Sequence, residues 1–387
     1  MGLEASGTGL AESATELAAS AAGLAASAMG PAASAMGLAE SATSRTTYRG
    51  RYAPSPTGWL HLGNARTALL AWVRCRAASG SFVMRVEDLD VPRTKPEAVS
   101  GNLDELRWLG LDWDEGPDVG GAHAPYLQSQ RGELYQSVLE RLQATGRVFE
   151  CYLSRRDASE AASAPHGALA ARGSIAAGAV GRGAASEAVG VYGPQQRALN
   201  ARLGPVRRVA GKAFSLRYAV GEGVVAFSDA LAGPQRFDLA REVGDFVLRR
   251  SDALWAYQLA VVVDDAAMGV TEVVRGGDLL ASTAAQLALF EGLELQPPGY
   301  AHVPVLLDEG GERMAKRRGS LTLQELRLAG VSPERVVGAL AVTLGWLERP
   351  EEVATAEVLA AFAASAVPTA PSAPARLDRK LLDWLLA

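Results

Sequence analysis

The sequence predicts an α/β fold built around a parallel sheet, with an inserted α+β subdomain and a short helical part at the C-terminal end. Two observations predict it. Strand-like, loop and helix-like segments alternate from residue 47 onward, which is typical of parallel strands joined by helices. In addition, a chain of 387 residues with 48% hydrophobic residues is large enough to bury a sizeable core.

Local patterns predict the individual elements in turn. RGRYAPSPTG is typical of a strand that ends in a sharp turn, and a helix is expected from Asn64 to about Ser79. FSLRYAV and VVAFSD are expected to form the two strands of a hairpin. Further strands are expected at SFVMRVEDLD, VLRR, LAVVVDD and VTEVVRG, a helix over 283–294, two short helices within 321–345, and an amphipathic end at LDRKLLDWLLA.

The first 44 residues differ from the rest of the chain. They contain no Lys or Arg, and they repeat GLAESAT and AASAMG, so we expect a disordered or loosely helical tail. A secretory signal or a transit peptide needs basic residues, so neither interpretation fits. No uncharged apolar run is long enough for a membrane span, and we expect a cytoplasmic protein with no membrane partner.

Charge and cysteine usage exclude several classes of protein. The formal net charge is −5, and four of these charges belong to glutamates of the tail, so the body is nearly neutral rather than strongly basic. Cys75 and Cys151, the two cysteines, cannot form a disulfide framework or a four-thiolate zinc site. No heptad or long apolar stripe stands out, so we expect a monomer.

The segment PSPTGWLHLGN, residues 54–64, carries the strongest functional signal. Its prolines and glycine turn the chain sharply after a strand, and His61 and Gly63 then stand at the opening of a helix. A helix N-terminus presents N–H groups and a positive dipole end, which suit a phosphate. Gly63 would let a nucleotide approach the backbone, and His61 could donate to a phosphate oxygen. The alternative is a capped turn with a surface histidine.

A second segment, RMAKRRGS at residues 313–320, is a basic loop that contains glycine and precedes a helical stretch. A lysine on such a loop, here Lys316, can neutralise the charge that builds on a triphosphate as pyrophosphate departs. On its own the segment is typical of a solvated basic turn. With PSPTGWLHLGN upstream, it becomes the expected partner loop of a nucleotide site.

These segments resemble the two signatures of class I aminoacyl-tRNA synthetases. RYAPSPTG, FVMRVEDLD and DEGPDVGGAHAPYLQSQR are similar to the glutamyl branch, and AYQLAVVVDDAAMGVTEVVRGGDLL resembles the glutamyl-queuosine tRNA(Asp) synthetase family more closely. The resemblance covers roughly 47–157 and 214–345 and implies a Rossmann-like catalytic domain. Asn64 departs from the histidine usual at the end of the first signature, and Ala315 and Arg317 replace serines around Lys316.

The resemblance also implies a division of the chain and a set of site residues. The expected parts are a low-complexity tail (1–46), two halves of the nucleotide-binding catalytic domain (47–157 and 214–345), a degenerate insertion between them (158–213) and a helical, Ala/Pro-rich C-terminal segment (346–387). The implied ATP-binding residues are His61, Gly63, Asn64 and Lys316, of which His61, Asn64 and Lys316 are catalytic. The implied glutamate-binding residues are Arg51, Tyr52, Ala53, Pro54, Ser55, Glu87, Tyr257 and Arg275.

Within that glutamate site, Arg51 would pair with the side-chain carboxylate, which favours glutamate over glutamine. Glu87 would accept from the α-ammonium group. Each residue also has a structural alternative: Glu87 could cap a helix, Tyr257 could belong to the core, and Arg275 could pair with Asp278. Asp264 and Asp265 are expected to be structural, since paired carboxylates after a strand often fix a loop.

The zinc pattern of the family is incomplete here. The family commonly has CxC, then a tyrosine, and a cysteine about four residues later. This chain has Cys151 followed by Tyr152 and Leu153, and then Tyr192 and Gln196. One cysteine and one tyrosine cannot close a tetrahedral site, and His166 is a poor substitute, so we expect no zinc.

The expected activity is tRNA-independent activation of L-glutamate with ATP and Mg²⁺, followed by transfer to the queuosine at the wobble position of tRNA(Asp). The short, Ala/Pro-rich stretch after Lys316 favours this acceptor, because it does not suggest a large anticodon-binding module. Two alternatives stay open. One is a truncated or divergent glutamyl-tRNA synthetase that charges tRNA(Glu), and the other is a non-catalytic nucleotide- or tRNA-binding relative.

Overall fold

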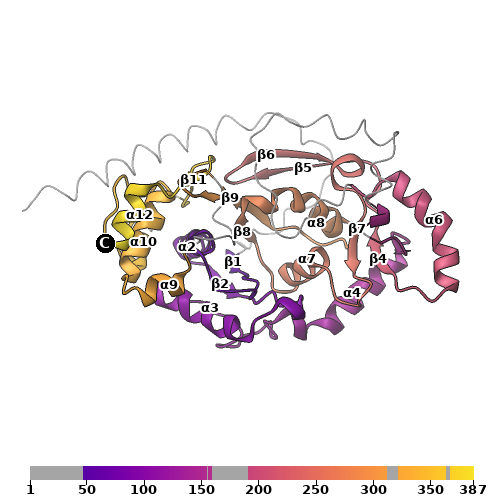
Figure 1. Cartoon of the computed structure of the whole chain (residues 1–387), viewed down its shortest axis with the longest axis horizontal. Coiled ribbons are helices and arrows are strands. Elements are labelled where there is room, and N and C mark those ends of the chain that lie inside the picture. Colours follow the sequence, from indigo (N-terminus) through magenta and orange to yellow (C-terminus); the bar gives the residue numbers. More distant parts are fainter. Residues whose placement is uncertain (1–46, 155, 159–190, 312–320, 363–366) are drawn as a thin grey trace, which may run out of the picture.

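The structure is a computed structural model that describes residues 47–154, 156–158, 191–311, 321–362 and 367–387. A six-stranded sheet and a three-stranded sheet, each covered by helices, make up most of these residues (Figure 1). The tail predicted over 1–46 lies outside the described residues, as does much of the predicted insertion. None of the helices in the described part is long and apolar enough to cross a membrane.

The six-stranded sheet confirms the predicted parallel α/β class. Its order is β2-β1-β8-β9-β5-β6, and all neighbouring strands run parallel except β6, which is antiparallel to β5 at the edge. The strands are β1 (Arg49–Tyr52), β2 (Ser81–Met84), β8 (Glu272–Gly276), β9 (Gly299–Val303), β5 (Val224–Asp229) and β6 (Gly233–Asp238).

Strand β1 lies where the strand order reverses. On one side it pairs with β2, which follows it in sequence, and on the other it pairs with β8 at Gly50 and Glu272. From β8 the chain continues outward to β9. In open parallel sheets, ligands bind beyond the carboxyl ends of the strands at such a reversal. The topology therefore predicts a ligand site at the segments that follow β1 and β8.

Helix α2 (Leu62–Ala77) joins β1 to β2 and is buried along most of its length. Its buried face includes Arg66, whose Nη2 donates to the carbonyl of Thr343 at 2.9 Å. Helix α2 lies between the sheet on one side and the C-terminal helices on the other (Figure 1). It confirms the helix predicted from Asn64 to about Ser79. The C-terminal helices are α9 (Leu323–Leu328), α10 (Pro333–Thr343), α11 (Thr355–Phe362) and α12 (Arg379–Leu386). Helices α9 and α10 confirm the two predicted within 321–345, α12 confirms the amphipathic end, and α11 lies between them.

The predicted hairpin of FSLRYAV and VVAFSD is wrong. The first segment forms β4 (Ser215–Tyr218), the central strand of the second sheet, between β3 (Val148–Cys151) and β7 (Phe246–Arg249). The second segment forms β5, which pairs with β6 instead. Asp229 explains this choice, because its Oδ1 accepts the N–H groups of Leu231 at 3.0 Å and Ala232 at 2.8 Å and so closes the β5–β6 turn.

The predicted strand LAVVVDD is also wrong, because these residues lie inside helix α7 (Tyr257–Ala267). Every residue from Leu259 to Asp265 is buried, so the apolar run carries no helical periodicity that would distinguish it from a buried strand. Helix α7 packs between α4 (Gly132–Ala144) and α8 (Leu280–Gly292), the latter confirming the helix predicted near 283–294.

The remaining described elements are two helices, two short strands and four helical turns. Helix α3 (Pro96–Trp108) follows β2, and the described end of the insertion forms helix α6 (Pro194–Val209). Asn200 of α6 accepts the N–H of Tyr152 at 2.9 Å, so this helix is fixed to the end of β3. The other elements are β10 (Leu306–Leu307), β11 (Ala375–Arg376) and the helical turns η1 (Val91–Arg93), η2 (Gln128–Gln130), η3 (Leu239–Val243) and η4 (Gly277–Leu279).

Candidate functional site

His61 is the N-cap of α2, immediately beyond the turn that follows β1. Its ring Nδ1 accepts the backbone N–H groups of Gly63 at 3.1 Å and Asn64 at 3.3 Å, and the Asn64 side chain accepts the N–H of His61 at 3.3 Å. Because Nδ1 acts as an acceptor, the proton of the neutral ring is on Nε2. The predicted phosphate donor is therefore fixed in the tautomer that can donate from Nε2.

Gly63 has a steric role that the sequence did not indicate. A Cβ atom at this position would lie 3.0 Å from Cε1 and 3.1 Å from Nδ1 of His61. Contacts that short require one of the groups to shift. The missing side chain at Gly63 therefore makes room for the His61 ring over the first turn of α2.

The start of α2 is hydrogen-bonded to residues 321–323, which follow the second signature segment (313–320) in sequence. The N–H of Leu62 donates to the carbonyl of Leu321 at 3.3 Å, and the N–H of Leu323 donates to the carbonyl of Leu60 at 2.8 Å. These bonds surround a bridge between His61 and Thr322. Lys316 itself lies outside the described residues, but Leu321, only five positions later in the sequence, is bonded next to His61.

A buried carboxyl group supports this junction. Oε2 of Glu105, on α3, accepts the N–H of Leu60 at 3.1 Å, and the carboxyl group also accepts the backbone N–H of Gln324. Glu105 is 3% exposed, and its Oε1 has no partner among the described residues. Burial raises the pKa of this carboxyl group to about 7, against the opposing effect of the two N–H donors.

Arg51, the last residue but one of β1, is almost fully buried at the strand reversal. Its Nη1 donates to the carbonyl of Val274 on β8 at 3.1 Å, and its Nε lies 3.4 Å from Oδ1 of Asp265 on α7. The guanidinium group therefore bridges the two strands at which the topology places a ligand. Sequence reasoning treated Asp265 as a loop-fixing carboxylate after a strand, whereas it lies in a helix and contacts Arg51 directly.

The turn after β1 holds the remaining residues of the first signature. The hydroxyl of Tyr52 donates to the carbonyl of Asn64 at 3.2 Å, which ties β1 to the first turn of α2. Ala53 is half-buried and Ser55 is exposed. The carbonyl of Pro54 accepts the N–H of Glu87 at 3.0 Å, and this bond brings the segment after β2 against the turn.

Glu87 lies in a strongly charged environment. Its Oε1 accepts from Nη2 of Arg85 at 3.1 Å, and Nη1 of Arg85 donates to Asp265 at 2.7 Å. Burial raises the pKa of Glu87, while Arg85 and Arg51 act in the opposite direction. These contacts do not support the alternative in which Glu87 caps a helix. Sequence reasoning missed Arg85, which follows β2 directly and lies two residues before Glu87.

Arg275 on β8 is held by neutral groups. Its Nε donates to Nε2 of His302 at 3.0 Å, its Nη2 to the hydroxyl of Thr283 at 2.7 Å, and its Nη1 to the hydroxyl of Tyr257 at 3.3 Å. His302 in turn contacts Oδ2 of Asp229 through Nδ1 at 2.5 Å. Sequence reasoning missed His302, Thr283 and Asp229, because nothing in the local sequence indicates that they converge on Arg275.

The candidate residues share one electrostatic environment. Burial raises the pKa of Tyr257, and the charges of Arg275, Glu87 and Arg51 also influence it. Arg51 and Arg275 are each 4% exposed. The structure thus brings together the predicted residues of β1, α7, β8 and the segment after β2, with two cationic groups and one carboxylate that could face an amino acid.

Asp264 is structural, as expected. It accepts from Nε of Arg131 at 2.6 Å, from Nε2 of Gln128 at 2.7 Å and from the hydroxyl of Tyr135 at 2.8 Å. All of these partners are buried, and they fix α7 to the start of α4. These bonds therefore anchor the helix that carries Tyr257 and Asp265.

The described remnant of the zinc pattern does not fit a metal ion. Sγ of Cys151 lies 3.4 Å from the hydroxyl of Tyr192, which donates to the carbonyl of Gln196 at 3.3 Å. The Gln196 side chain donates to the carbonyl of Ala158 at 3.2 Å. Across the described ranges no group of three or more His, Cys, Asp and Glu side chains could hold a metal, and His166 lies outside these ranges.

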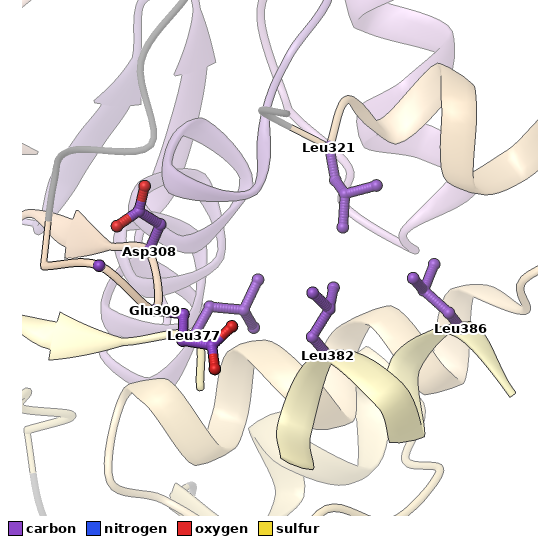
Figure 2. A pocket seen from close by; sticks show the side chains of 7 residues that line it. Asp308, Glu309, Leu321, Leu377, Leu382 and Leu386 are labelled. Atoms are coloured by element: carbon purple, nitrogen blue, oxygen red, sulfur yellow. The ribbon is translucent and has the colours of Figure 1, made fainter. Parts of the chain in front are cut away.

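A cavity of about 290 Å³ lies near Leu321 but is unsuited to a nucleotide. Leu321 faces Leu382 and Leu386 of α12 across it (Figure 2). Its polar rim consists of Asp308 and Glu309, whose carboxylates would repel a triphosphate. The charged cluster at the ends of β1 and β8, rather than this apolar space, is the candidate substrate site.

Comparison with known proteins relates the chain to aminoacyl-tRNA synthetases. Residues 47–384 match the family model described as tRNA synthetases class I (E and Q), catalytic domain. The chain is 49% identical to the glutamyl-Q tRNA(Asp) synthetase of Symbiobacterium thermophilum over 83% of this chain and 94% of that protein. It is 45% identical to the glutamyl-Q tRNA(Asp) synthetase of Nitratidesulfovibrio vulgaris over 84% and 94%.

Longer relatives match less completely. The glutamate–tRNA ligase of Sulfurihydrogenibium sp. is 35% identical over 87% of this chain, but the match spans only 66% of that ligase. Among solved structures, the glutamate-tRNA synthetase of Elizabethkingia anophelis has a TM-score of 0.71 at 23% identity, covering 88% of this chain and 70% of that one. That likeness supports the fold of the described residues.

Proposed function

Since the chain belongs to the class I tRNA synthetases of the E and Q branch, and within it to the glutamyl-Q tRNA(Asp) synthetase family, we propose that it activates L-glutamate with ATP and transfers it to the queuosine of tRNA(Asp). Class I synthetases are ligases that use ATP with Mg²⁺. The enzyme class follows from family membership, whereas the substrate, the acceptor and the residue roles are the proposal.

The observation that carries the choice of glutamate is the environment of Arg275. Each hydrogen-bond partner that the described part of the chain offers this buried guanidinium group is neutral. The nearby carboxylate of Asp265 is bonded to Arg85 and Arg51 rather than to Arg275. A buried charge without a directly bonded counterion is costly, and a substrate carboxylate would compensate it. Arg51 supplies a second guanidinium group from the adjacent strand, so the site suits a ligand with two carboxylates.

The proposed roles of the individual residues follow from charge. Arg51 pairs with the side-chain carboxylate of glutamate. Arg275, bonded to Tyr257, binds a substrate carboxylate from the β8 side of the site. Glu87 accepts from the α-ammonium group, which also favours the ionised form of a carboxyl group whose pKa burial has raised. Backbone and side-chain atoms of Tyr52, Ala53, Pro54 and Ser55 form the wall on the α2 side.

In the first step, an α-carboxylate oxygen of glutamate attacks the α-phosphorus of ATP. A new O–P bond forms, the bond to the β-phosphate oxygen breaks, and pyrophosphate leaves. Mg²⁺ bound to ATP would supply positive charge to the departing pyrophosphate. The N–H groups of the first turn of α2 are bonded to His61 and Leu321, so α2 stabilises the phosphate charge through the positive end of its dipole, and Nε2 of His61 donates to a phosphate oxygen. Asn64 and Gly63 keep this first turn in place, and Lys316 neutralises the departing pyrophosphate.

In the second step, a hydroxyl of queuosine attacks the carbonyl carbon of glutamyl-adenylate. An ester bond forms, AMP leaves, and the hydroxyl proton is released to solvent or to AMP. The names of the relatives and the nearly complete coverage of their length support tRNA(Asp) as the acceptor. A glutamyl-tRNA synthetase acting on tRNA(Glu) is the second candidate, favoured by the match to glutamate–tRNA ligases.

The deciding experiment is ATP–pyrophosphate exchange with glutamate, glutamine or aspartate in the absence of RNA. We expect exchange with glutamate alone, and its loss in Lys316→Ala. Exchange that needs tRNA(Glu) would support the second candidate. No exchange with or without either tRNA would leave a non-catalytic nucleotide- or tRNA-binding relative. Queuosine-dependent transfer of labelled glutamate to tRNA(Asp) then tests the acceptor.

A further inference from the structure

We infer that Asp229 and His302 are positioning residues that orient Arg275 for a carboxylate of the substrate and so contribute to the binding of glutamate. This inference rests on the proposed function, because it assigns the carboxylate partner of the same site. It adds two residues that approach the site from the far side, from β5 and β9. Neither was expected from the sequence to act there.

Asp229, the last residue of β5, is held in place by several hydrogen bonds. Its Oδ1 accepts the N–H groups of Leu231, Ala232 and His302 at 3.0, 2.8 and 3.1 Å, and its Oδ2 contacts Nδ1 of His302 at 2.5 Å. Although burial opposes the charged form, these hydrogen bonds lower the pKa of Asp229. The carboxylate is therefore ionised and acts only as an acceptor.

The tautomer of His302 follows from both sides of its ring. Nδ1 faces the carboxylate of Asp229, which requires a proton on Nδ1. Nε2 faces two donors, Nε of Arg275 at 3.0 Å and the hydroxyl of Thr283 at 3.2 Å, which requires a lone pair on Nε2. The neutral Nδ1–H form satisfies both requirements. Burial also lowers the pKa of His302, to about 4, so the ring stays neutral at physiological pH.

This arrangement fixes the plane of the Arg275 guanidinium group. One N–H on each of its three nitrogens is directed at His302, Thr283 or Tyr257. A guanidinium group has five N–H donors, so each terminal nitrogen carries a second one. Two terminal N–H donors in a fixed plane are what bidentate binding of a carboxylate requires. The three contacts thus determine the direction from which a carboxylate can be bound.

The neutral imidazole also explains why Asp229 does not pair with Arg275 directly. A direct ion pair would satisfy the charge of the guanidinium group within the protein and weaken its attraction for a ligand. His302 accepts one hydrogen bond from Arg275 but brings no formal charge. Arg275 is therefore oriented without a hydrogen-bonded counterion, and its N–H donors remain for the substrate.

The variants that test the relay are Asp229→Asn, His302→Ala and His302→Gln. An amide at position 229 can donate to Nδ1, which favours the Nε2–H tautomer and turns an N–H toward the N–H of Arg275. We expect Asp229→Asn and His302→Ala to raise KM for glutamate by about 10- to 100-fold in ATP–pyrophosphate exchange, a range typical of losing an oriented charge-assisted contact. The KM for ATP should change by less than about twofold.

His302→Gln and Asp245→Asn complete the set. Oε1 of a glutamine can occupy the place of Nε2 and accept from Arg275, so His302→Gln should restore KM for glutamate to within about fivefold of wild type. Asp245 is a buried carboxylate of the second sheet that pairs with Arg197. Asp245→Asn therefore controls for loss of a buried carboxylate, and its KM for glutamate should be unchanged.

A second measurement does not depend on activity. The chain has four histidines, so long-range ¹⁵N–¹H spectra of histidine-labelled full-length protein can resolve the ring of His302, assigned by His302→Gln. We expect the Nδ1–H form in wild type and its loss in Asp229→Asn. An Nε2–H form in wild type would overturn the relay even if His302→Ala fails to fold.

The two measurements separate the inference from the proposed function. Wild-type enzyme that exchanges with glutamate, together with unchanged KM for glutamate in folded Asp229→Asn and His302→Ala, would refute the positioning role alone. Wild-type enzyme that does not respond to glutamate would refute the proposed function, and with it the assignment of a glutamate carboxylate to Arg275. The tautomer would then still report whether His302 orients the guanidinium group.

Discussion

Nδ1 of His61 accepts the N–H of Gly63 at 3.1 Å, so the side chain that we assign to phosphate binding also caps the helix that presents it. The two roles use different atoms of one ring. Capping uses the lone pair on Nδ1, and donation to phosphate uses the proton on Nε2. A substitution that keeps the first and removes the second can therefore separate stability from catalysis.

His61→Asn is that substitution, because asparagine is a good N-cap but cannot reach as far as Nε2. We expect the free energy of unfolding to stay within about 1 kcal/mol of wild type and kcat to fall by about 10²- to 10³-fold, as for loss of one donor to developing charge. Urea unfolding and ATP–pyrophosphate exchange measure the two. His61→Ala should lower both the free energy of unfolding and kcat. Full activity in His61→Asn would contradict the role of His61 in catalysis.

Gly63→Ala tests the space reserved for the ring. The new Cβ would lie 3.0 Å from Cε1 of His61, so the ring must move. Alanine also raises helix propensity by about 1 kcal/mol. We therefore expect activity to fall at least about tenfold while stability is kept or gained.

The matched control is Gly204→Ala in α6, where the nearest side-chain atom would lie 3.5 Å from the new Cβ. This variant should keep wild-type activity. Equal activity in Gly63→Ala and Gly204→Ala would show that the ring position does not matter.

Arg51→Lys tests the pairing with the side-chain carboxylate. Lysine keeps the charge but loses the planar pair of donors and the bond to Val274. We expect KM for glutamate to rise by about 100-fold and the preference for glutamate over glutamine to narrow. Arg76→Lys, which alters a guanidinium group bound to Asp112 and Asp114 away from the site, should leave both unchanged. A rise in KM for ATP alone would refute the assignment.

Glu105 should make stability depend on pH. Its pKa is raised from 4.5 to about 7 in the folded protein, so the folded state binds the proton more tightly than the unfolded state does. Its contribution to stability is therefore present in full below pH 4.5 and is lost as pH rises through 7. The loss is on the order of 3 kcal/mol, at 1.36 kcal/mol for each pKa unit.

Glu105→Gln removes this titration while keeping an oxygen that can accept from Leu60. Urea unfolding should show equal stability of the two proteins near pH 4, below the ordinary pKa of 4.5, and a more stable variant near pH 8. Parallel stability profiles across this range would show that Glu105 does not titrate there. The wild-type carboxylate has an unpartnered Oε1 among the described residues, which explains why its charged form is the costly one.

Metal removal should leave the fold intact. Cys151, Tyr192 and Gln196 are connected by hydrogen bonds rather than arranged around an ion. Dialysis against a chelator, followed by restoration of Mg²⁺, should change neither the unfolding midpoint nor the exchange rate. One equivalent of zinc per chain by elemental analysis, with loss of helicity on chelation, would contradict this expectation.

Much of the fold could be predicted from the sequence where short-range patterns decide the outcome. The turn of PSPTG and the start of α2 followed from prolines and glycine near His61. The segment containing Leu259 and Asp265 could not be assigned correctly, because a fully buried helix lacks the periodicity that separates it from a strand. The partner of β5 depended on a side chain, Asp229, whose turn-closing bonds are visible only in three dimensions.

The same distinction applies to the site. Arg51, Glu87 and Arg275 were identified through the resemblance of the motifs around them. His302 stands alone among apolar residues, where a histidine is more often part of the core, and its contact with Arg275 arises from the pairing of β8 with β9. The position of Lys316, outside the described residues, stays a prediction.

The bonds that join α2 to the far end of the chain also set an order of events during synthesis. Arg66 and Thr343 are separated by 277 residues, and the bridge between His61 and Thr322 spans almost as much of the chain. Contacts of such long range form late, because the intervening chain must first exist and be brought together. A nascent chain still on the ribosome therefore has its first signature but lacks the segment that completes the junction. The nucleotide site that we propose is thus completed only after the segment around Thr322 and Thr343 has been made.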